Sequence, residues 1–308
     1  MSVTSTVRVK VPATTANIGS GFDCLGAALT LYNRFRFSVF DGESVQIIAT
    51  GAEADRVSTD ASNLVYQSFL KLYEHLGKTP PPVKIEITMD VPLARGLGSS
   101  ATAIVGGLVG ANALAGSPLS QEEVMQLAIK IEGHPDNVVP ALLGGCRLAA
   151  SGIDRDWEIC DVPWNRSIIP IVAIPNFELS TAEARRVLPA EYSRADSIFN
   201  ASHLGLLLRG LETGRADWLK AALQDRIHQP YRQFLIRGYE EVRSAALAVG
   251  THGVVISGAG PTLLALASPA DAEAVKSAMH IAWTGQGVDV QVELLQIDIQ
   301  GAIVEWSS

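Results

Sequence analysis

The most informative stretch of the chain reads Pro92-Leu93-Ala94-Arg95-Gly96-Leu97-Gly98-Ser99-Ser100-Ala101-Thr102. It follows residues 83–89, where Val, Ile and Met alternate with polar side chains as in a half-buried strand, and it leads into the small apolar residues 101–115. We therefore expect a strand, a glycine loop and a helix. Gly96 and Gly98 lack the Cβ atoms that would keep a ligand away from the backbone. Ser99 and Ser100 suit the start of a helix, whose unpaired amides bind phosphate readily.

The same loop has other interpretations. An ordinary turn with a serine cap has a similar composition. Gly96, Gly98 and Ala101 also satisfy the dinucleotide pattern GxGxxG/A of many oxidoreductases, but that pattern needs a second strand with an acidic residue about 20 positions further on. A second helix is predicted there instead. The common nucleotide loop GxxxxGK[ST] does not fit, because no lysine follows Gly98.

The composition narrows the class of protein. The chain has 308 residues, of which 47% are hydrophobic and 18% charged, which suits a soluble protein of two modest domains or one large one. A net charge of −8 and the lack of a basic run argue against binding to nucleic acid. Its cysteines, Cys24, Cys146 and Cys160, lack metal-ligand spacing and are expected to be reduced. No leader-like start and no apolar span longer than residues 103–115 is present, so we expect a cytoplasmic protein without membrane contact.

The first strand and the loop after it contain two polar side chains of interest. Valines alternate with Arg and Lys in residues 7–11, which predicts a strand that stops at Pro12. In the loop of residues 13–26, glycines free the backbone to bring Asn17 and Asp23 together. Taken alone, these two residues would be expected to cap turns.

A second polar cluster, residues 132–137, follows a helix predicted from a capping box at residues 120–123. Glu132 ends this helix, where the helix dipole disfavours a carboxylate, so a metal or cationic partner is expected. His134 precedes a proline and should be extended. Asp136 or Asn137 would then cap a short helix that ends near residues 144–145.

The second half of the chain predicts further strands and helices. An apolar run at residues 168–174 indicates a buried strand, and a capping box at residues 180–183 places Thr181 and Arg185 one helical turn apart. Basic side chains gather at residues 225–232, next to a break in a helical region. Residues 254–267 predict a hairpin with a glycine turn. A helix at residues 269–283 and a strand at residues 288–294 complete a pattern typical of the α+β class.

Three loops, residues 12–26, 92–102 and 257–262, together resemble the signature motifs of the GHMP small-molecule kinases. The second motif of that family is a proline followed by Gly-Leu-Gly-Ser-Ser-Ala, and the agreement spans most of the chain. Residues 11–23, 132–137 and 257–262 look most like the members that phosphorylate L-homoserine. The resemblance implies a two-domain GHMP kinase fold of the α+β class, with the nucleotide near the domain junction. We expect an N-terminal ATP-binding domain at residues 1–165 and a C-terminal domain at residues 166–308.

The resemblance also implies an activity and the residues for it. The reaction would be ATP-dependent phosphorylation of the side-chain hydroxyl of L-homoserine, which gives O-phospho-L-homoserine on the route to threonine. Residues 92–102 would wrap the ATP phosphates and Asn63 would lie by the adenine. Ser100 and Glu132 would ligate Mg²⁺, which favours oxygen ligands. The L-homoserine pocket would contain Asn17, Asp23, His134, Thr181, Arg185 and Arg232.

Within that pocket, Arg185 and Arg232 stand at the positions where the family binds the substrate carboxylate. Asp23 can hold the ammonium group or orient the hydroxyl. It is also the nearest candidate for a general base, although phosphoryl transfer depends mostly on positioning and a base is optional. Members of the family are often dimers, so a homodimer is consistent with the resemblance.

Two alternatives keep the fold and change the function. A kinase for mevalonate would use a substrate without an ammonium group, which would leave Asp23 without a cationic partner. A non-catalytic regulator would not need the pairing of Ser100 with Glu132. Arg95 is an unexpected residue in the second motif, because it places a charge between the proline and the first glycine, where small residues would be sufficient. It either contacts a phosphate or, as we expect for an exposed charge, lies in solvent.

Overall fold

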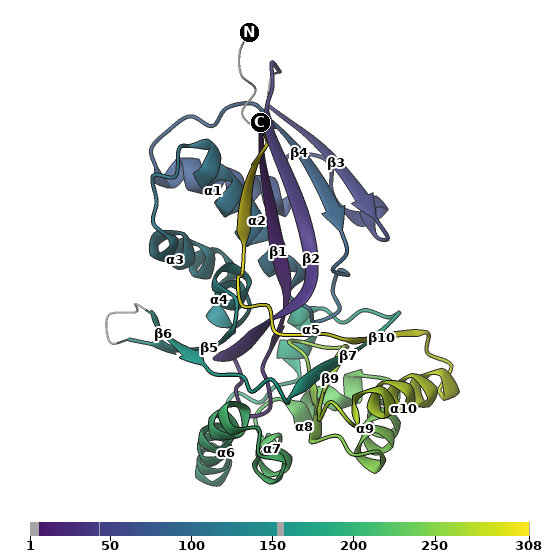
Figure 1. Cartoon of the computed structure of the whole chain (residues 1–308). Helices are drawn as coiled ribbons and strands as arrows, with labels where there is room; N and C mark the ends of the chain where they lie inside the picture. Colours follow the sequence, from purple (N-terminus) through teal and green to yellow (C-terminus); the bar gives the residue numbers. More distant parts are fainter. Residues whose placement is uncertain (1–5, 43, 153–156, 308) are drawn as a thin grey trace.

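The computed structural model of the chain describes residues 6–42, 44–152 and 157–307 (Figure 1). Its larger sheet is mostly antiparallel, with the strand order β11-β1-β2-β4-β3, and β5 and β6 extend it from β2. The parallel pair in this sheet is β3 with β4. The strands are β1 (Thr6–Ala16), β2 (Leu25–Val39), β3 (Val45–Gly51), β4 (Val83–Met89), β5 (Cys146–Ser151), β6 (Trp157–Val162) and β11 (Ile303–Ser307).

Helices cover one face of the larger sheet, as Figure 1 shows. They are α1 (Leu64–His75), α2 (Ser99–Leu114), α3 (Gln121–Glu132) and α4 (Pro135–Leu143). The small residues of α2 allow this helix to lie directly on β2. A Cβ atom on Gly106 would come within 2.5 Å of the Phe35 ring, and one on Gly110 within 2.3 Å of the Phe37 ring. The glycines of α2 thus place the helix start, and the loop before it, close to the sheet.

The smaller sheet has the strand order β10-β7-β9-β8, formed by β7 (Ile169–Pro175), β8 (Gly253–Ile256), β9 (Leu263–Ala267) and β10 (Val290–Leu294). Helices α9 (Tyr239–Ala248) and α10 (Ala272–Gly285) pack on one face of it. Side chains from the other face, including Val172 and Leu264, join a core with α6 (Arg194–Thr213), α7 (Ala216–Ala222) and Leu25 of β2. This shared core joins the two sheets.

The end of the chain returns to the larger sheet, where β11 pairs antiparallel with β1 (Figure 1). The chain passes from the larger to the smaller sheet between Val162 and Ile169. The fold is of the α+β class, as predicted. Among the residues that the structure describes, no helix has both the length and the apolar character needed to cross a membrane.

Two details of the predicted elements are wrong. Strand β1 does not stop at Pro12 but continues to Ala16. The pairing of β1 with β2 shifts register between Pro12 and Ala13, and this bulge lets the strand continue past the proline. Helix α4 is capped by neither Asp136 nor Asn137, which both lie inside it. His134 is the N-cap, and its extended backbone (φ −151°, ψ 149°) is the conformation that a residue before proline prefers.

Candidate active site

The glycine loop enters α2 through Gly98, which has a left-handed φ of 66°. Gly96 has a φ of 74°. A Cβ atom on Gly96 would lie 2.3 Å from the Ser257 carbonyl oxygen, and one on Gly98 would lie 1.9 Å from Thr14 Oγ1. These glycines are therefore required where other parts of the chain approach the loop. The prediction that they clear space for a ligand missed this crowding, because the neighbouring residues are distant in the sequence.

The three loops of the sequence pattern meet at this point. Ser257 Oγ lies 2.9 Å from Thr15 Oγ1 and 2.7 Å from the Gly96 carbonyl oxygen. The amide of Gly258 donates to the Ala16 carbonyl at 2.9 Å, and the amide of Thr14 donates to the Leu97 carbonyl at 3.1 Å. The end of β1, the glycine loop and the β8–β9 turn thus form one hydrogen-bonded cluster.

A cavity of about 540 Å³ opens beside this cluster. The predicted residues that line it are Asn17, Asp23, Asn63, Leu93, Ala94, Arg95, Gly96, Gly98, Ser99, Ser100, Glu132, His134, Thr181, Arg185 and Arg232. Leu97, Ala101 and Thr102 do not line the cavity, and all three are fully buried. Pro92 lines a second depression.

One end of the cavity is largely apolar, with walls from Phe35, Val57 and Met89. Asn63 holds the loop at this end. Its Oδ1 caps α1 by accepting from the amides of Val65 (2.9 Å) and Tyr66 (3.3 Å), as the sequence predicted for an N-cap. A flat, apolar group with polar edges would fit this end of the cavity.

At the start of α2, Ser100 Oγ donates to Glu132 Oε1 at 2.7 Å. Glu132 is the last residue of α3. The two predicted metal-binding residues are therefore adjacent, and the hydroxyl that faces Glu132 belongs to Ser100. Two side-chain oxygens thus lie next to each other at the start of α2, where helix amides lack partners within the helix.

The opposite end of the cavity contains Asp23 and Arg185, which form a bidentate ion pair with distances of 2.8 and 3.0 Å. Asn17 and Asp23 both have positive φ angles, 60° and 55°, which are uncommon outside glycine. Asn17 supports this backbone by accepting from the Asp23 amide and by donating to the Gly258 carbonyl, each at 2.8 Å. Backbone strain of this kind is often found at binding sites.

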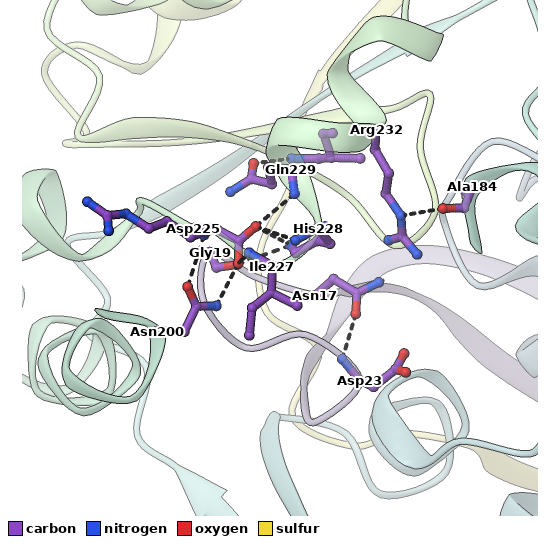
Figure 2. A network of polar contacts seen from close by, with 12 residues as sticks. Asn17, Gly19, Asp23, Ala184, Asn200, Asp225, Ile227, His228, Gln229 and Arg232 are labelled. Atoms are coloured by element: carbon purple, nitrogen blue, oxygen red, sulfur yellow. Dashed lines mark hydrogen bonds and ion pairs between the residues drawn. The ribbon is translucent and has the colours of Figure 1, made fainter. Parts of the chain in front are cut away.

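Arg232 lies deeper than Arg185 and is 1% exposed. Its Nε donates to the Ala184 carbonyl at 3.1 Å (Figure 2). Its NH1 donates to the Gly258 carbonyl, also at 3.1 Å. Burial, together with the nearby charge of Arg185, lowers the pKa of Arg232 to about 10. The side chain therefore remains a cation at neutral pH. The Phe22 ring lies 5.0 Å from its Cζ, which is within cation–π range.

Asp136 belongs to this site but was missed as a functional residue. Its Oδ1 lies 2.5 Å from His134 Nδ1, while its buried Oδ2 has no hydrogen-bond partner among the described residues. Burial alone would lower the pKa of His134, but the hydrogen bond and charge of Asp136 and the charge of Glu132 raise the pKa above its usual value. The cavity thus contains His134 hydrogen-bonded to the Asp136 carboxylate. A His-Pro-Asp sequence at a helix start was the signal for this pair.

Arg95 does not lie in solvent, so the prediction of an exposed charge is wrong. It is 7% exposed, and its guanidinium donates to the Leu93, Pro175 and Asn176 carbonyls. It also faces the carboxylates of Glu53 (3.5 Å) and Glu178 (3.2 Å). A planar guanidinium has enough donors to satisfy all these oxygens, and this explains why an arginine can be buried here.

The glycine loop at a helix start, beside a cavity between two α+β units, defines a small-molecule kinase of the GHMP type. The family model described as "GHMP kinases N terminal domain" matches residues 63–145, and "GHMP kinases C terminal" matches residues 207–285. The chain is also similar in fold to L. major mevalonate kinase, with a TM-score of 0.70 at 16% identity over 94% of this chain and 95% of that chain.

Relatives with higher sequence identity indicate which group of GHMP kinases the chain belongs to. The chain is 67% identical to homoserine kinase of Trichormus variabilis, over 98% of this chain and all (100%) of that protein. It is 59% identical to homoserine kinase of Thermosynechococcus vestitus, over 96% of this chain and 98% of that protein. The crystal structure of homoserine kinase from Cytophaga hutchinsonii superimposes with a TM-score of 0.89 at 30% identity, covering 99% of both chains. The chain belongs to the homoserine kinase family.

Proposed function

We propose that this chain transfers the γ-phosphoryl group of ATP to the side-chain hydroxyl of L-homoserine, which gives O-phospho-L-homoserine. The observation that carries the proposal is one cavity that joins a glycine loop at a helix start to a pocket with opposite charges. Arg185 and Arg232 face this pocket together with Asp23 and Asp136. An amino acid with a carboxylate and an ammonium group matches this arrangement, and the names of the relatives support the same substrate.

ATP would span the cavity from its apolar end to the start of α2. The adenine would lie near Asn63, and the phosphates would lie on the amides of the glycine loop and of Ser99 and Ser100. The loop comes from the proposed domain at residues 1–165, whereas Arg185 and Arg232 come from residues 166–308. The proposed nucleotide and substrate subsites therefore meet near the junction of the two units.

L-homoserine would place its carboxylate between Arg185 and Arg232. Its ammonium group would lie near Asp23 and Asp136, whose buried Oδ2 needs a donor. In this binding mode the substrate exchanges partners with the existing Asp23–Arg185 pair, and no net charge is buried. Asn17, His134 and Thr181 would complete the pocket around the hydroxyl.

Mg²⁺ fits the pairing of Ser100 and Glu132. Among the described residues, no group of three or more His, Cys, Asp or Glu forms a metal cluster, so phosphate oxygens and water would complete the coordination shell. When bound, the ion would neutralise charge on the transferred phosphoryl group. Ser100 and Glu132 would hold the ion next to the helix start, where the amides would bind the phosphates.

For the transfer itself, the residues of the chain would act mainly by positioning the hydroxyl in line with the γ-phosphate. Asp23 was the nearest candidate for a general base. Its bidentate pairing with Arg185, and its place next to the proposed ammonium group, favour a binding role instead. The hydroxyl proton can pass to the transferred phosphate, so no side-chain base is required.

The proposal is tested by coupled ADP release with ATP and Mg²⁺ against homoserine, mevalonate, serine and threonine. We expect turnover on homoserine alone. Turnover on mevalonate alone would replace the substrate assignment, and ATP binding without any turnover would support a regulator. Glu132→Gln should raise the Mg²⁺ concentration needed for half-maximal activity, with Glu122→Gln on the same helix as the exposed control. An unchanged Mg²⁺ requirement would remove Glu132 from the metal site.

A further inference from the structure

A buried polar network connects the loop of residues 17–24 with residues 225–232 (Figure 2). At its centre, the Asp225 carboxylate accepts four hydrogen bonds at 2.7–3.1 Å. The donors are the Asn200 side chain and the backbone amides of Ile227, His228 and Gln229. These amides lead into the short helix α8 (Gln229–Arg232), which ends at Arg232. Asp225 therefore fixes the backbone that carries this arginine.

His228 extends the network to the substrate loop of residues 17–24. Its side chain is completely buried, and its Nε2 lies 3.2 Å from the carbonyl oxygen of Gly19. A carbonyl can only accept, so Nε2 must hold the hydrogen. The buried Nδ1 has no partner among the described residues. Burial lowers the pKa of His228, so the ring is neutral and acts as a single donor toward Gly19.

The same ring makes a second contact with that loop. It stacks on Phe22 with a centroid distance of 5.2 Å and an interplanar angle of 22°. Phe22 in turn lies within cation–π range of both Arg232 (5.0 Å) and Arg185 (5.8 Å). His228 does not line the cavity, so its contacts reach the site only through these neighbours.

We propose that His228 is a positioning residue that holds the loop of residues 17–24 against α8. The Gly19 hydrogen bond and the Phe22 stack keep Asp23 and Arg232 at the separation that a zwitterionic substrate requires. This assignment to homoserine binding rests on the proposed function, whereas the effect of His228 on the loop does not. The hydrogen bond and the ring stack of His228 both go to the loop of residues 17–24.

Kinetics of two substitutions test the role in substrate binding. His228→Leu fills the space but loses the donor, and we expect the KM for homoserine to rise about tenfold, the ratio set by about 1.4 kcal/mol. The KM for ATP should change less than about twofold, because the ATP subsite is distant from the network. His228→Gln keeps an amide donor with similar reach and should restore most of the loss. His280→Leu, an exposed site on α10, is the control.

Hydrogen–deuterium exchange of the ligand-free protein tests the role in the loop independently of activity. Peptides that cover residues 17–24 should exchange faster in His228→Leu than in wild type or His228→Gln. Unchanged exchange there, or a parallel rise of both KM values, would overturn the proposal. If wild type does not phosphorylate homoserine, the proposed function fails, while the exchange result still decides whether His228 positions the loop.

Discussion

Arg95→Met tests whether the buried arginine of the glycine loop stabilises the junction between the two units. The substitution keeps much of the side-chain length and removes every donor. It leaves the Pro175 and Asn176 carbonyls, which belong to the other unit, without the guanidinium that now bridges to them at 3.0 and 3.3 Å. It also leaves Glu53 and Glu178 without this cation.

The expected loss of unfolding free energy in Arg95→Met depends on how deeply the ion pairs are buried. Removing one partner of a fully buried ion pair costs about 3–5 kcal/mol, and a hydrogen bond to a charged group contributes about 1.5–3 kcal/mol. The side chains of Glu53 and Glu178 are 19% and 42% exposed, so water can solvate part of their charge when the arginine is removed. Arg56 also remains beside both carboxylates. We therefore expect a loss of about 3 kcal/mol, toward the lower end of the buried range.

For a chain of this size, that loss corresponds to a fall in Tm of about 6 °C, at about 2 °C per kcal/mol. Thermal unfolding followed by circular dichroism or differential scanning fluorimetry measures it. Arg34→Met is the matched control, because Arg34 pairs with Asp90 while their side chains are 53% and 46% exposed. Exposed pairs contribute at most about 1 kcal/mol. If Arg95→Met lowers the Tm no more than Arg34→Met does, the buried cluster makes no net contribution and the reasoning is refuted.

Gly98→Ala should abolish most activity and lower stability, because its Cβ would lie 1.9 Å from Thr14 Oγ1 at a φ of 66°. Gly77→Ala is the control, because Gly77 has the same left-handed backbone (φ 64°) but a Cβ atom there would have no atom within 4 Å. Equal Tm values for the two variants would contradict the steric argument. Burial and nearby Asp136 and Asp23 raise the pKa of Cys24 to about 11. This thiol should therefore remain protonated at pH 8 and should react faster with iodoacetamide as the pH approaches 11. Exposed Cys160 should be alkylated before Cys24. Mass spectrometry of the early products measures this order, and modification of Cys24 first would contradict the prediction.

Much of the local structure could be predicted because its causes are close together in the sequence. The capping boxes that begin at Ser120 and Ser180 were predicted, and both are present with their reciprocal hydrogen bonds. The N-cap at Asn63 and the β8–β9 hairpin are likewise confirmed. Each of these features depends on residues a few positions apart, so propensity and hydrogen-bonding pattern were sufficient.

The predictions failed where distant residues decide the outcome. Arg95 was expected in solvent, yet its hydrogen bond to the Pro175 carbonyl spans 80 positions of sequence. Asp136 or Asn137 was expected to cap a short helix, because nothing local indicates that the Asp136 Oδ2 would be buried without a partner among the described residues. Nothing local in residues 225–232 indicated that the side chains of His228 and Asp225 would both be fully buried.

The sequence by itself determined the order of strands and helices, the glycine loop and the family motifs, since these depend on periodicity and on short patterns of residues. Only the tertiary structure decided which side chains share one cavity and which support it from behind. Gly96 shows the physical reason. Its own pattern indicates a turn, but the need for glycine comes from the Ser257 carbonyl, which folding brings to 2.3 Å from the position of a Cβ atom.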